Sequence, residues 1–436
     1  MLTLEEKLGN KSAQIGIVGL GYVGLPLAVA FSEAGFKVLG FDIQQKRVNS
    51  INQGKSYIAD VAQEQLKTAV SNNLLQATIK QSRLRETDVI CICVPTPLTK
   101  TKDPDLYHVI HESREISKRL QPGQLVVLES TTYPGTTREV VQPILESSKL
   151  RGGTDFYLAY SPERVDPGNR KHNIKNTPKI VGGINSKSTK LAQILYSQIA
   201  ITVIPVSSPD VAEMTKIFEN VFRSVNIALV NELAQLCEKL GVSVWEVIDA
   251  ASTKPFGYMP FYPGPGIGGH CIPLDPYYLA NKAREFDFHT RFIELAAEIN
   301  EAMPYHVVSQ ILEALNSRGK SLNGAKILIL GVAYKKDIED IRESPSLKLI
   351  QLLRAKGAEI SYNDPYIPEI KLSKGSLTSV KLTGKNLASA DCVIIATDHS
   401  CYNINEVVAR TKMVFDTRGA TKHLKPSNNN VVRLGE

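Results

Sequence analysis

Short apolar runs alternate with helix-length amphipathic stretches over the first two hundred residues of the chain. The runs are AQIGIVGLG, FKVLGFD, TDVICICVP, GQLVVLEST and DFYLAYSPE. Runs that are nearly continuous in Val, Ile, Leu and Cys are typical of parallel strands buried on both faces. The alternation therefore predicts a Rossmann-like, doubly wound α/β domain over residues 1–205.

The pattern changes to a single long amphipathic helix over residues 208–240. Ser208 can cap its N-terminus, Pro209 suits the first helical position, and Gly241 ends the segment. At 1.5 Å per residue the helix would be about 48 Å long. We expect it to act as a spine between two α/β halves and as a dimer contact. Its apolar residues recur at positions 214, 217, 218, 221, 222, 225, 229, 233, 236 and 240.

Strand-like runs return after residue 318, as AKILILGVA, AEISYND, ADCVIIATD and KMVFDTRG. They predict a second Rossmann-like domain over residues 319–436, joined to the first by a central helical domain over residues 206–318. No glycine fingerprint follows the first strand of this second domain. A nucleotide would therefore be bound there by other means.

Composition and charge narrow the class of protein. The chain has 436 residues, 43% hydrophobic and 22% charged, which are globular proportions. The net charge is +7 and the basic residues are scattered, which argues against nucleic-acid binding. No apolar run is long enough to span a membrane, and the N-terminus has no apolar leader. The six cysteines form no CxxC pair, so we expect no metal site, reduced thiols and a cytoplasmic protein.

A dinucleotide fingerprint, GLGYVG at residues 19–24, follows the first apolar run and opens a helical stretch. Its glycines allow a tight turn, close approach of the backbone to a pyrophosphate, and packing of helix on strand. Asp42 follows Gly24 by 18 residues, at the end of the next strand, where a carboxylate can bind a ribose 2′-hydroxyl. This context favours NAD over NADP and over a purely structural turn. Arg47 could line the adenosine side or be a solvated surface charge.

A second candidate site is a loop rich in Pro and Gly over residues 252–276, STKPFGYMPFYPGPGIGGHCIPLDP. Loops of this kind often carry function. Its thiol, Cys271, precedes Asp275 by four residues, and Lys216 and Asn220 share one face of the long helix. A thiol near an ammonium is a better nucleophile, but a passive thiol and a solvated Lys/Asn face are equally open from spacing alone.

A nicotinamide site combined with a nucleophilic thiol suggests oxidation of an aldehyde. Addition of a thiolate gives a thiohemiacetal that can donate a hydride, and water then cleaves the resulting thioester to an acid. A cysteine hydrolase that pairs Cys271 with His270 is less suitable, because sequence neighbours in an extended loop point in opposite directions. A two-electron dehydrogenase and a non-enzymatic nucleotide-binding regulator are further alternatives.

Together these motifs resemble the UDP-glucose/GDP-mannose dehydrogenase family, which oxidises the C6 alcohol of a nucleotide sugar with two NAD⁺. The resemblance is carried by GLGYVGLP at 19–26, VPTP at 94–97, STTYPGTT at 130–137, SPERVDPG at 161–168, GIGGHCIPLDP at 266–276, YKKDIEDIRESPS at 334–346 and DTRG at 416–419. It implies that Cys271 is the nucleophile and Lys216 the acid/base. It also implies that Asn220 is an oxyanion or water donor, that Asp275 helps to activate water, and that the Glu163 carboxylate lies near that water.

The resemblance also implies the ligand contacts. NAD would be bound by Gly19, Gly21, Tyr22, Val23, Gly24, Asp42, Arg47, Thr96, Thr131 and Arg342. The UDP-sugar would be bound by Glu163, Arg164, Val165, Lys216, Asn220, Arg223, Tyr262, Gly268, Tyr334, Lys335 and Arg418. Cations from the second domain suit the diphosphate, since that domain has no phosphate loop.

Within the family, the segments SPERVDPG, PGPGIGGHCIP and RFIELAAEINEAMP are similar to the branch that acts on UDP-N-acetylhexosamines. UDP-N-acetylglucosamine is the expected substrate, with UDP-N-acetylmannosamine as runner-up and UDP-N-acetylgalactosamine and UDP-glucose as further alternatives. In the mannosamine enzymes the segment before the catalytic loop carries basic residues that reach a neighbouring subunit, whereas STKPFGYM stands here. The resemblance implies a homodimer or higher homo-oligomer that makes a precursor of surface polysaccharides such as the lipopolysaccharide O-antigen.

Overall fold

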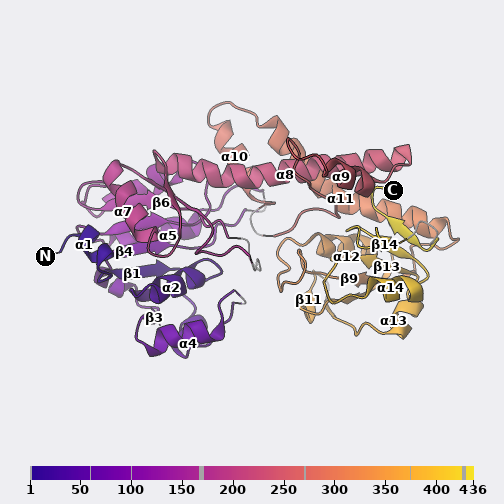
Figure 1. Cartoon of the computed structure of the whole chain (residues 1–436), viewed down its shortest axis with the longest axis horizontal. Helices are drawn as coiled ribbons and strands as arrows, with labels where there is room; N and C mark the ends of the chain where they lie inside the picture. Colours follow the sequence, from indigo (N-terminus) through magenta and orange to yellow (C-terminus); the bar gives the residue numbers. More distant parts are fainter. Residues whose placement is uncertain are drawn as a thin grey trace. The chain divides into compact units, whose positions relative to one another are not determined.

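The chain folds into two compact units. The computed structural model describes residues 2–58, 60–99, 101–165, 171–269, 272–373, 375–424 and 429–436. The first unit comprises Met1–Glu219 and Tyr277–Phe288, and the second comprises Asn220–Pro276 and His289–Glu436. Each unit has its own sheet covered by helices (Figure 1).

Eight strands form the main sheet of the first unit among the described residues, in the order β3-β2-β1-β4-β5-β6-β7-β8. The strands are β1 (Gln14–Val18), β2 (Lys37–Phe41), β3 (Leu75–Thr78), β4 (Val89–Ile92), β5 (Leu125–Leu128), β6 (Tyr157–Tyr160), β7 (Lys179–Gly183) and β8 (Val203–Pro205). The helices are α1 (Leu4–Gly9), α2 (Gly24–Glu33), α3 (Gln45–Asn52), α4 (Gln63–Ser71), η1 (Gln81–Glu86), α5 (Tyr107–Ser117), η2 (Thr137–Val141), α6 (Gln142–Glu146) and α7 (Ser186–Tyr196).

Both faces of this sheet are buried, as the apolar runs predict. Along β4, Val89 and Cys91 pack into one hydrophobic core, whereas Ile90 and Ile92 pack into another. Successive side chains of a strand point to opposite faces, so two cores require helices on both sides. The predicted doubly wound α/β class is confirmed.

One strand departs from the parallel order. β7 pairs antiparallel with β6, whereas β8 pairs parallel with β7. Antiparallel neighbours need no crossover helix, so the segment between β6 and β7 is free to be a loop. That loop begins with the SPERV sequence, and the reversal places Lys179, the first residue of β7, beneath it.

The long helix is confirmed as α8 (Pro209–Leu240), with Val211 N donating to the Ser208 hydroxyl at 3.3 Å. Its buried stripe is partly polar and includes Glu213, Lys216, Asn220 and Asn231. Much of its apolar pattern is exposed instead, namely Met214, Phe218, Phe222, Leu229, Leu236 and Leu240. The hydrophobic periodicity therefore predicts the helix correctly but does not mark the face that is buried within this chain.

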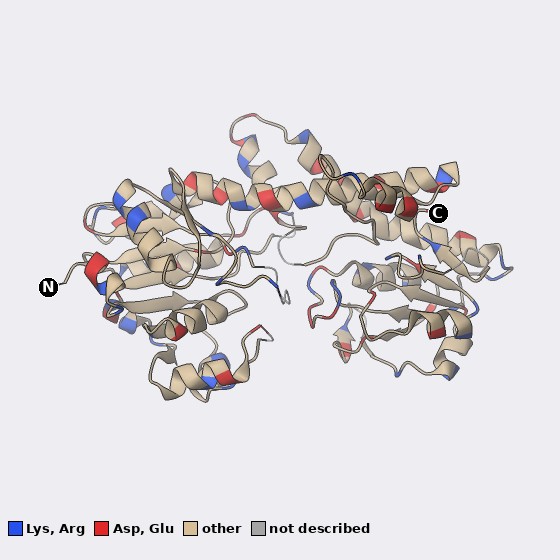
Figure 2. Ribbon diagram, viewed as in Figure 1, with Lys and Arg blue, Asp and Glu red and all other residues tan. Residues whose placement is uncertain are grey.

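The second unit also has a parallel Rossmann-like sheet, in which five strands in the described part of the chain have the order β10-β9-β13-β14-β15. They are β9 (Lys326–Leu330), β10 (Glu359–Asn363), β13 (Cys392–Ile395), β14 (Val414–Asp416) and β15 (Val431–Arg433), with a hairpin of β11 (Glu369–Lys371) and β12 (Ser376–Thr378). Its helices include α9 (Val244–Ala251), α11 (Arg291–Asn316), α12 (Pro345–Ala355), α13 (Gly384–Ser389) and α14 (Ile404–Arg410), whereas α10 (Asp275–Arg284) belongs to the first unit from Tyr277 onward. Described basic and acidic residues are interspersed over both units (Figure 2).

Candidate active site

The glycine fingerprint forms a tight turn between β1 and α2. Gly19 has a φ of +89°, and a Cβ there would lie 2.6 Å from the carbonyl oxygen of Cys93. A Cβ on Gly24 would lie 1.8 Å from the oxygen of Gly19, so helix and turn touch as backbone on backbone. At Gly21 a Cβ would meet nothing within 4 Å, which leaves that side of the turn open. This geometry fits a pyrophosphate seated at the N-terminus of α2.

Asp42 stands beside this turn, one residue beyond β2. It is 7% exposed and accepts hydrogen bonds from Leu20 N at 3.1 Å and Gln44 N at 2.8 Å. Arg47 Nη1 lies 3.3 Å from its Oδ2. The carboxylate is therefore fixed at the carboxyl edge of the sheet, where a cofactor ribose can reach it. Arg47, for which two interpretations were open, neutralises this carboxylate and stacks on Tyr57, whose ring centroid is 5.8 Å away.

Two further predicted NAD residues meet at the next strand ends. The Thr96 hydroxyl donates to the carbonyl oxygen of Thr131 at 2.7 Å, which joins the loops after β4 and β5. Tyr278 of α10 donates to the carbonyl oxygen of Thr96 at 2.7 Å. Tyr22, in the fingerprint turn, is 49% exposed. These residues belong to the first unit and surround the same edge of its sheet as Asp42.

A buried glutamate ties the STTYPGTT loop to α8. Glu213 accepts hydrogen bonds from Gly135 N at 2.6 Å and from the Thr137 amide and hydroxyl at 2.8 and 2.6 Å. Burial raises the pKa of Glu213 to about 8, although these donors oppose the shift. Lys216, one turn further along α8, is 9% exposed. The hydrogen bonds of Glu213 therefore fix Lys216, the predicted acid/base, relative to the loop that carries Thr131.

The SPER segment places Glu163 and Arg164 against different partners. Glu163 Oε1 accepts the backbone N–H groups of Arg164 and Val165, each at 2.7 Å. Arg164 instead forms an ion pair with Glu219 of α8, with Nη2 to Oε1 at 2.5 Å. Arg164, a predicted substrate residue, is thus held by Glu219. This glutamate lies on α8 directly before Asn220 and three residues after Lys216.

Asn220 and Asp275 are in direct contact in the second unit. The Asn220 amide donates to Asp275 Oδ2, and the two side chains are 5% and 3% exposed. Asp275 is the first residue of α10, so the predicted loop ends there rather than at residue 276. Cys271 and His270 lie outside the described residues.

The Pro/Gly loop is anchored on both sides within the second unit. Asn231 Oδ1 of α8 accepts Gly264 N at 3.0 Å, and its amide donates to Asn300 of α11 at 2.9 Å. At the other end, Gly269 N donates to the carbonyl oxygen of Arg342 at 2.9 Å. A Cβ on Gly268 would lie 2.5 Å from the Cβ of Tyr334. The loop that precedes Cys271 is therefore held in one position by amides and by close contact that requires glycine.

The remaining predicted substrate residues are only partly brought together. A Cβ on Gly264 would lie 2.7 Å from Arg418 Nη1, so this arginine also borders the loop. Arg342 pairs with Asp340 at 2.6 Å.

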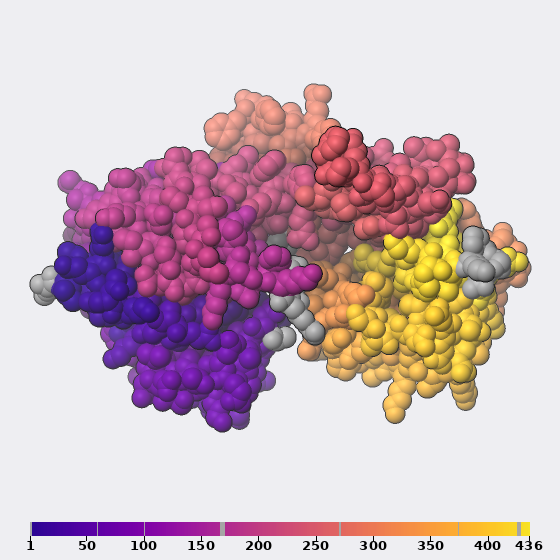
Figure 3. Space-filling view, in the orientation of Figure 1, coloured from indigo at the N-terminus to yellow at the C-terminus, as the bar shows by residue number. Residues whose placement is uncertain are grey.

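Other predicted substrate residues have partners elsewhere or lie at the surface. Tyr262 stacks on Trp245 and donates to Asp249 at 2.8 Å. Arg223 is exposed and Lys335 is half-buried. Figure 3 gives a surface view of the same chain.

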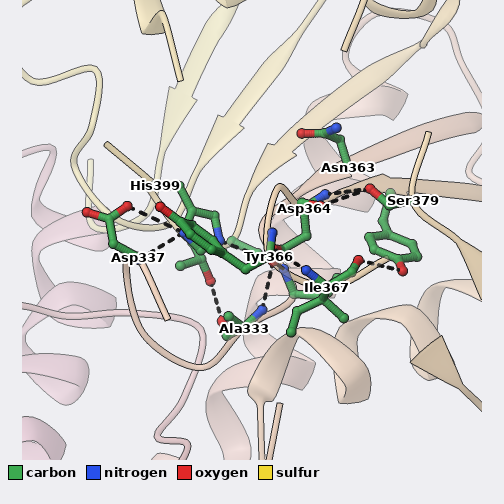
Figure 4. A network of polar contacts seen from close by, with 12 residues as sticks. Ala333, Asp337, Asn363, Asp364, Tyr366, Ile367, Ser379 and His399 are labelled. Carbon is green, nitrogen blue, oxygen red and sulfur yellow. Dashed lines mark hydrogen bonds and ion pairs between the residues drawn. The ribbon is translucent and has the colours of Figure 1, made fainter. Parts of the chain in front are cut away.

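A polar network that the sequence analysis missed fixes the loop of Tyr334 and Lys335 (Figure 4). His399 Nδ1 accepts Asp337 N at 3.0 Å, so its Nε2 carries the hydrogen that is donated to Asp364 Oδ2 at 3.1 Å. Asp364 also accepts Val332 N and Ala333 N at 2.7 and 3.0 Å. Asp364 directly follows β10, just as Asp42 directly follows β2. This match is a signal in the sequence that could have revealed the role of Asp364 in the network.

Three family models match the chain in order. They are the NAD binding domain of the UDP-glucose/GDP-mannose dehydrogenase family over residues 13–200, its central domain over 210–302, and its UDP binding domain over 328–423. The chain belongs to the UDP-glucose/GDP-mannose dehydrogenase family. It is an NAD-dependent nucleotide-sugar dehydrogenase that acts at C6 of a UDP-sugar.

Relatives of known activity cover nearly the whole chain. It is 38% identical to UDP-N-acetyl-D-mannosamine dehydrogenase of Pyrococcus horikoshii, over 94% of this chain and 96% of that protein. It is 36% identical to UDP-N-acetyl-D-glucosamine 6-dehydrogenase of Pseudomonas aeruginosa, over 89% and 91%. The solved structure of UDP-D-ManNAc dehydrogenase from Pyrococcus horikoshii superimposes with a TM-score of 0.88 at 35% identity, covering 97% of this chain and 99% of that one. No helix in the described ranges is long and apolar enough to cross a membrane.

Proposed function

We propose that this enzyme oxidises the C6 alcohol of a UDP-N-acetylhexosamine to a carboxylate in two successive steps. One alcohol, one water and two NAD⁺ would give one carboxylate, two NADH and three protons. The observation that carries this proposal is the buried Asn220–Asp275 pair at the end of the loop that contains Cys271. An enzyme that stopped at the aldehyde would have no use for a thiol four residues before a buried carboxylate that can direct water.

In the first step Lys216 takes the proton of the C6 hydroxyl and stabilises the alkoxide. The turn Gly19–Gly24 and Asp42 would hold NAD⁺, which would supply the hydride acceptor for both oxidations. Cys271 then adds to the aldehyde carbon, and the thiohemiacetal that results is oxidised to a thioester. The Lys216 ammonium and the Asn220 amide donate to the substrate oxygen.

In the last step water cleaves the thioester and restores the Cys271 thiol. Asp275 receives the proton of this water, Glu163 accepts a hydrogen bond from it, and Asn220 holds Asp275 in place. Arg164, Val165, Arg223, Tyr262, Gly268, Tyr334, Lys335 and Arg418 remain our candidates for the UDP-sugar contacts. Arg342 remains the candidate for a contact to NAD from the second half.

We propose UDP-N-acetylmannosamine as the first substrate to test. The expectation of UDP-N-acetylglucosamine is not confirmed, since relatives with either activity align over most of the chain. The mannosamine enzyme of Pyrococcus horikoshii is the more similar of these two, and its solved structure also superimposes on this chain. The STKPFGYM segment, in which Lys254 is the one basic residue, is the sequence feature that argues for glucosamine.

The test is a substrate panel of UDP-glucose, UDP-N-acetylglucosamine, UDP-N-acetylgalactosamine and UDP-N-acetylmannosamine, in which NADH and acid are measured together. We expect two NADH per acid and the highest kcat/KM with a UDP-N-acetylhexosamine. One NADH per sugar, with an aldehyde or ketone as product, would contradict four-electron oxidation. Turnover of the Cys271→Ser variant at the wild-type rate would remove the thiol from the mechanism.

We also propose a homodimer or higher homo-oligomer in the cytoplasm that supplies polysaccharide synthesis. The exposed apolar side chains of α8, among them Phe218 and Leu229 at 63% each, support association with a second copy. The division of labour between residues 1–205, 206–318 and 319–436, as NAD, central and UDP domains, remains part of this proposal.

A further inference from the structure

Lys179 is a buried ammonium that the proposed chemistry has not used. Its side chain is 4% exposed, at the start of β7. The Nζ atom lies 2.8 Å from Glu129 Oε2 and 3.3 Å from Glu163 Oε2, and 5.1 Å from the ring centroid of Tyr196. A buried ammonium is costly unless carboxylates compensate its charge, and here two do so.

Glu129 fixes Lys179 from the other side. It directly follows β5, its side chain is 0% exposed, and its Oε1 accepts the hydroxyl of Tyr196, the last residue of α7. Four segments thus contribute to one connected chain of hydrogen bonds and ion pairs, which runs from Tyr196 through Glu129 and Lys179 to Glu163. The ammonium has little freedom to move, because its partner carboxylate is itself held.

Glu163 is the end of this chain with access to solvent, with 16% of its side chain exposed. Its Oε1 accepts two backbone N–H groups, and its Oε2 faces Lys179. Burial acts to raise the pKa of Glu163, but Lys179, the two N–H groups and Lys216 act in the opposite direction, and the net shift is downward. Among the residues that the structure describes, Glu129 and Cys93 are further titratable groups that interact with it.

We infer that Lys179 is a positioning residue that fixes both the orientation and the negative charge of Glu163, and that Glu129 and Tyr196 serve to hold Lys179. The inference rests on the proposed place of Glu163 beside the hydrolytic water. It assigns Glu163 the part of a permanent hydrogen-bond acceptor for that water rather than a proton donor. A merely structural ion pair would stabilise the fold without affecting how turnover depends on pH.

The test compares the pH profiles of kcat for wild type, Lys179→Met and Lys179→Arg, with the best sugar of the panel. We expect the acid limb of Lys179→Met to move up by about one pH unit or more, because an opposite charge at this distance shifts a carboxyl by that amount. Lys179→Arg should restore the limb, and KM for NAD should stay within about twofold. Lys7→Met is the matched control, since it removes a lysine paired with Asp88 at 2.6 Å at the amino end of β4.

A second variant keeps the test valid if Lys179→Met alone does not fold. Lys179→Met/Glu129→Gln removes both buried charges and should fold, yet its acid limb should still be shifted. An unshifted limb in that folded variant would overturn the inference. So would a further shift when Lys179→Met is added to Glu163→Gln, because Lys179 would then act on another group.

Failure of the proposed function has a different signature. If Glu163→Gln leaves turnover and its pH profile unchanged, the place of Glu163 in the reaction is wrong. If Glu163→Gln alters both and the lysine variants alter neither, Glu163 keeps its place and the inference about Lys179 is wrong. The ratio of NADH to acid in the wild type tests the four-electron reaction separately from both.

Discussion

Asp42 and Asp364 occupy the same position in two similar folds, each one residue beyond the strand that pairs with the first strand of its sheet. Asp42 accepts two backbone N–H groups and lies beside an open glycine turn. Asp364 is 3% exposed and accepts four backbone N–H groups as well as His399. The first carboxylate can serve a ribose, whereas the second is committed to holding the protein's own loops, so the two units bind nucleotides differently.

The choice of cofactor should depend on Asp42. Asp42→Ala should lower kcat/KM for NAD about tenfold to a hundredfold, since a hydrogen bond to a charged group contributes about 1.5–3 kcal/mol. Its kcat/KM for NADP should rise, because the repulsion of the 2′-phosphate is gone. Initial rates with both cofactors measure this. An unchanged NAD/NADP ratio would mean that Asp42 does not face the ribose, and Glu64→Gln on the exposed face of α4 is the control.

The contribution of Asp364 to the free energy of unfolding should decrease as the pH falls into the acid range. Burial alone would raise the pKa of Asp364, but His399 and the backbone N–H groups lower it, so its folded pKa lies below the ordinary value of 3.8. Its contribution is complete above the unfolded pKa and is lost as the pH falls through the folded value. Asp364→Asn should cost about 1–3 kcal/mol at pH 7. Urea unfolding at pH 7 and pH 3 should show a smaller difference in the variant than in wild type, and equal differences would contradict this account.

His399 should control affinity for the nucleotide of the sugar. His399→Leu removes the acceptor of Asp337 N and loosens the loop that carries Tyr334 and Lys335. We expect the Kd for UDP, measured by calorimetry, to rise about fivefold to thirtyfold, in line with the loss of about 1–2 kcal/mol from a buried hydrogen bond. The Kd for NAD should be unchanged. His423→Leu, at an exposed histidine bonded to Asn405 at 3.2 Å, should alter neither constant.

Loss of the Asp275 carboxylate should slow the hydrolytic step. In Asp275→Asn we expect kcat to fall about a hundredfold or more, which is typical of removing a group that moves protons. The thioester on Cys271 should then accumulate, so a burst of NADH and an added sugar mass on the intact protein should appear. A slow variant without burst or adduct would place Asp275 in the first oxidation instead. Asp391→Asn, which removes a carboxylate paired with Lys412 at 3.2 Å, is the control.

The apolar stripe of α8 should be needed for association. Leu229→Lys/Leu236→Lys places two charges on side chains that are 63% and 51% exposed, so the fold of the chain should be preserved. Light scattering should show a smaller particle than wild type. Ile201→Lys, at an apolar residue that is 83% exposed and lies outside this helix, should leave the mass unchanged. An unchanged mass in the α8 variant would direct attention to another face.

The sequence predicts those parts of the molecule that local patterns determine. The alternation of runs predicts the two α/β sheets, and glycine spacing predicts the turn at Gly19–Gly24. Lys179 could not be predicted in the same way, since a lysine before IVGG resembles an exposed strand end. Its partner Glu129 lies 50 residues away in sequence, and no spacing rule connects them. The antiparallel β7 strand brings them together, and that reversal depends on the pairing of the whole sheet.

The connectivity of the units has a consequence for how the protein is made. The first unit includes Tyr277–Phe288, where Tyr278 bonds to Thr96 and Lys282 pairs with Glu139 at 2.5 Å. A gene fragment ending before this segment would therefore encode an incomplete first unit. On the ribosome, the NAD-binding half can reach its final form only after Phe288 has emerged, so its last helix is added during synthesis of the half that binds UDP.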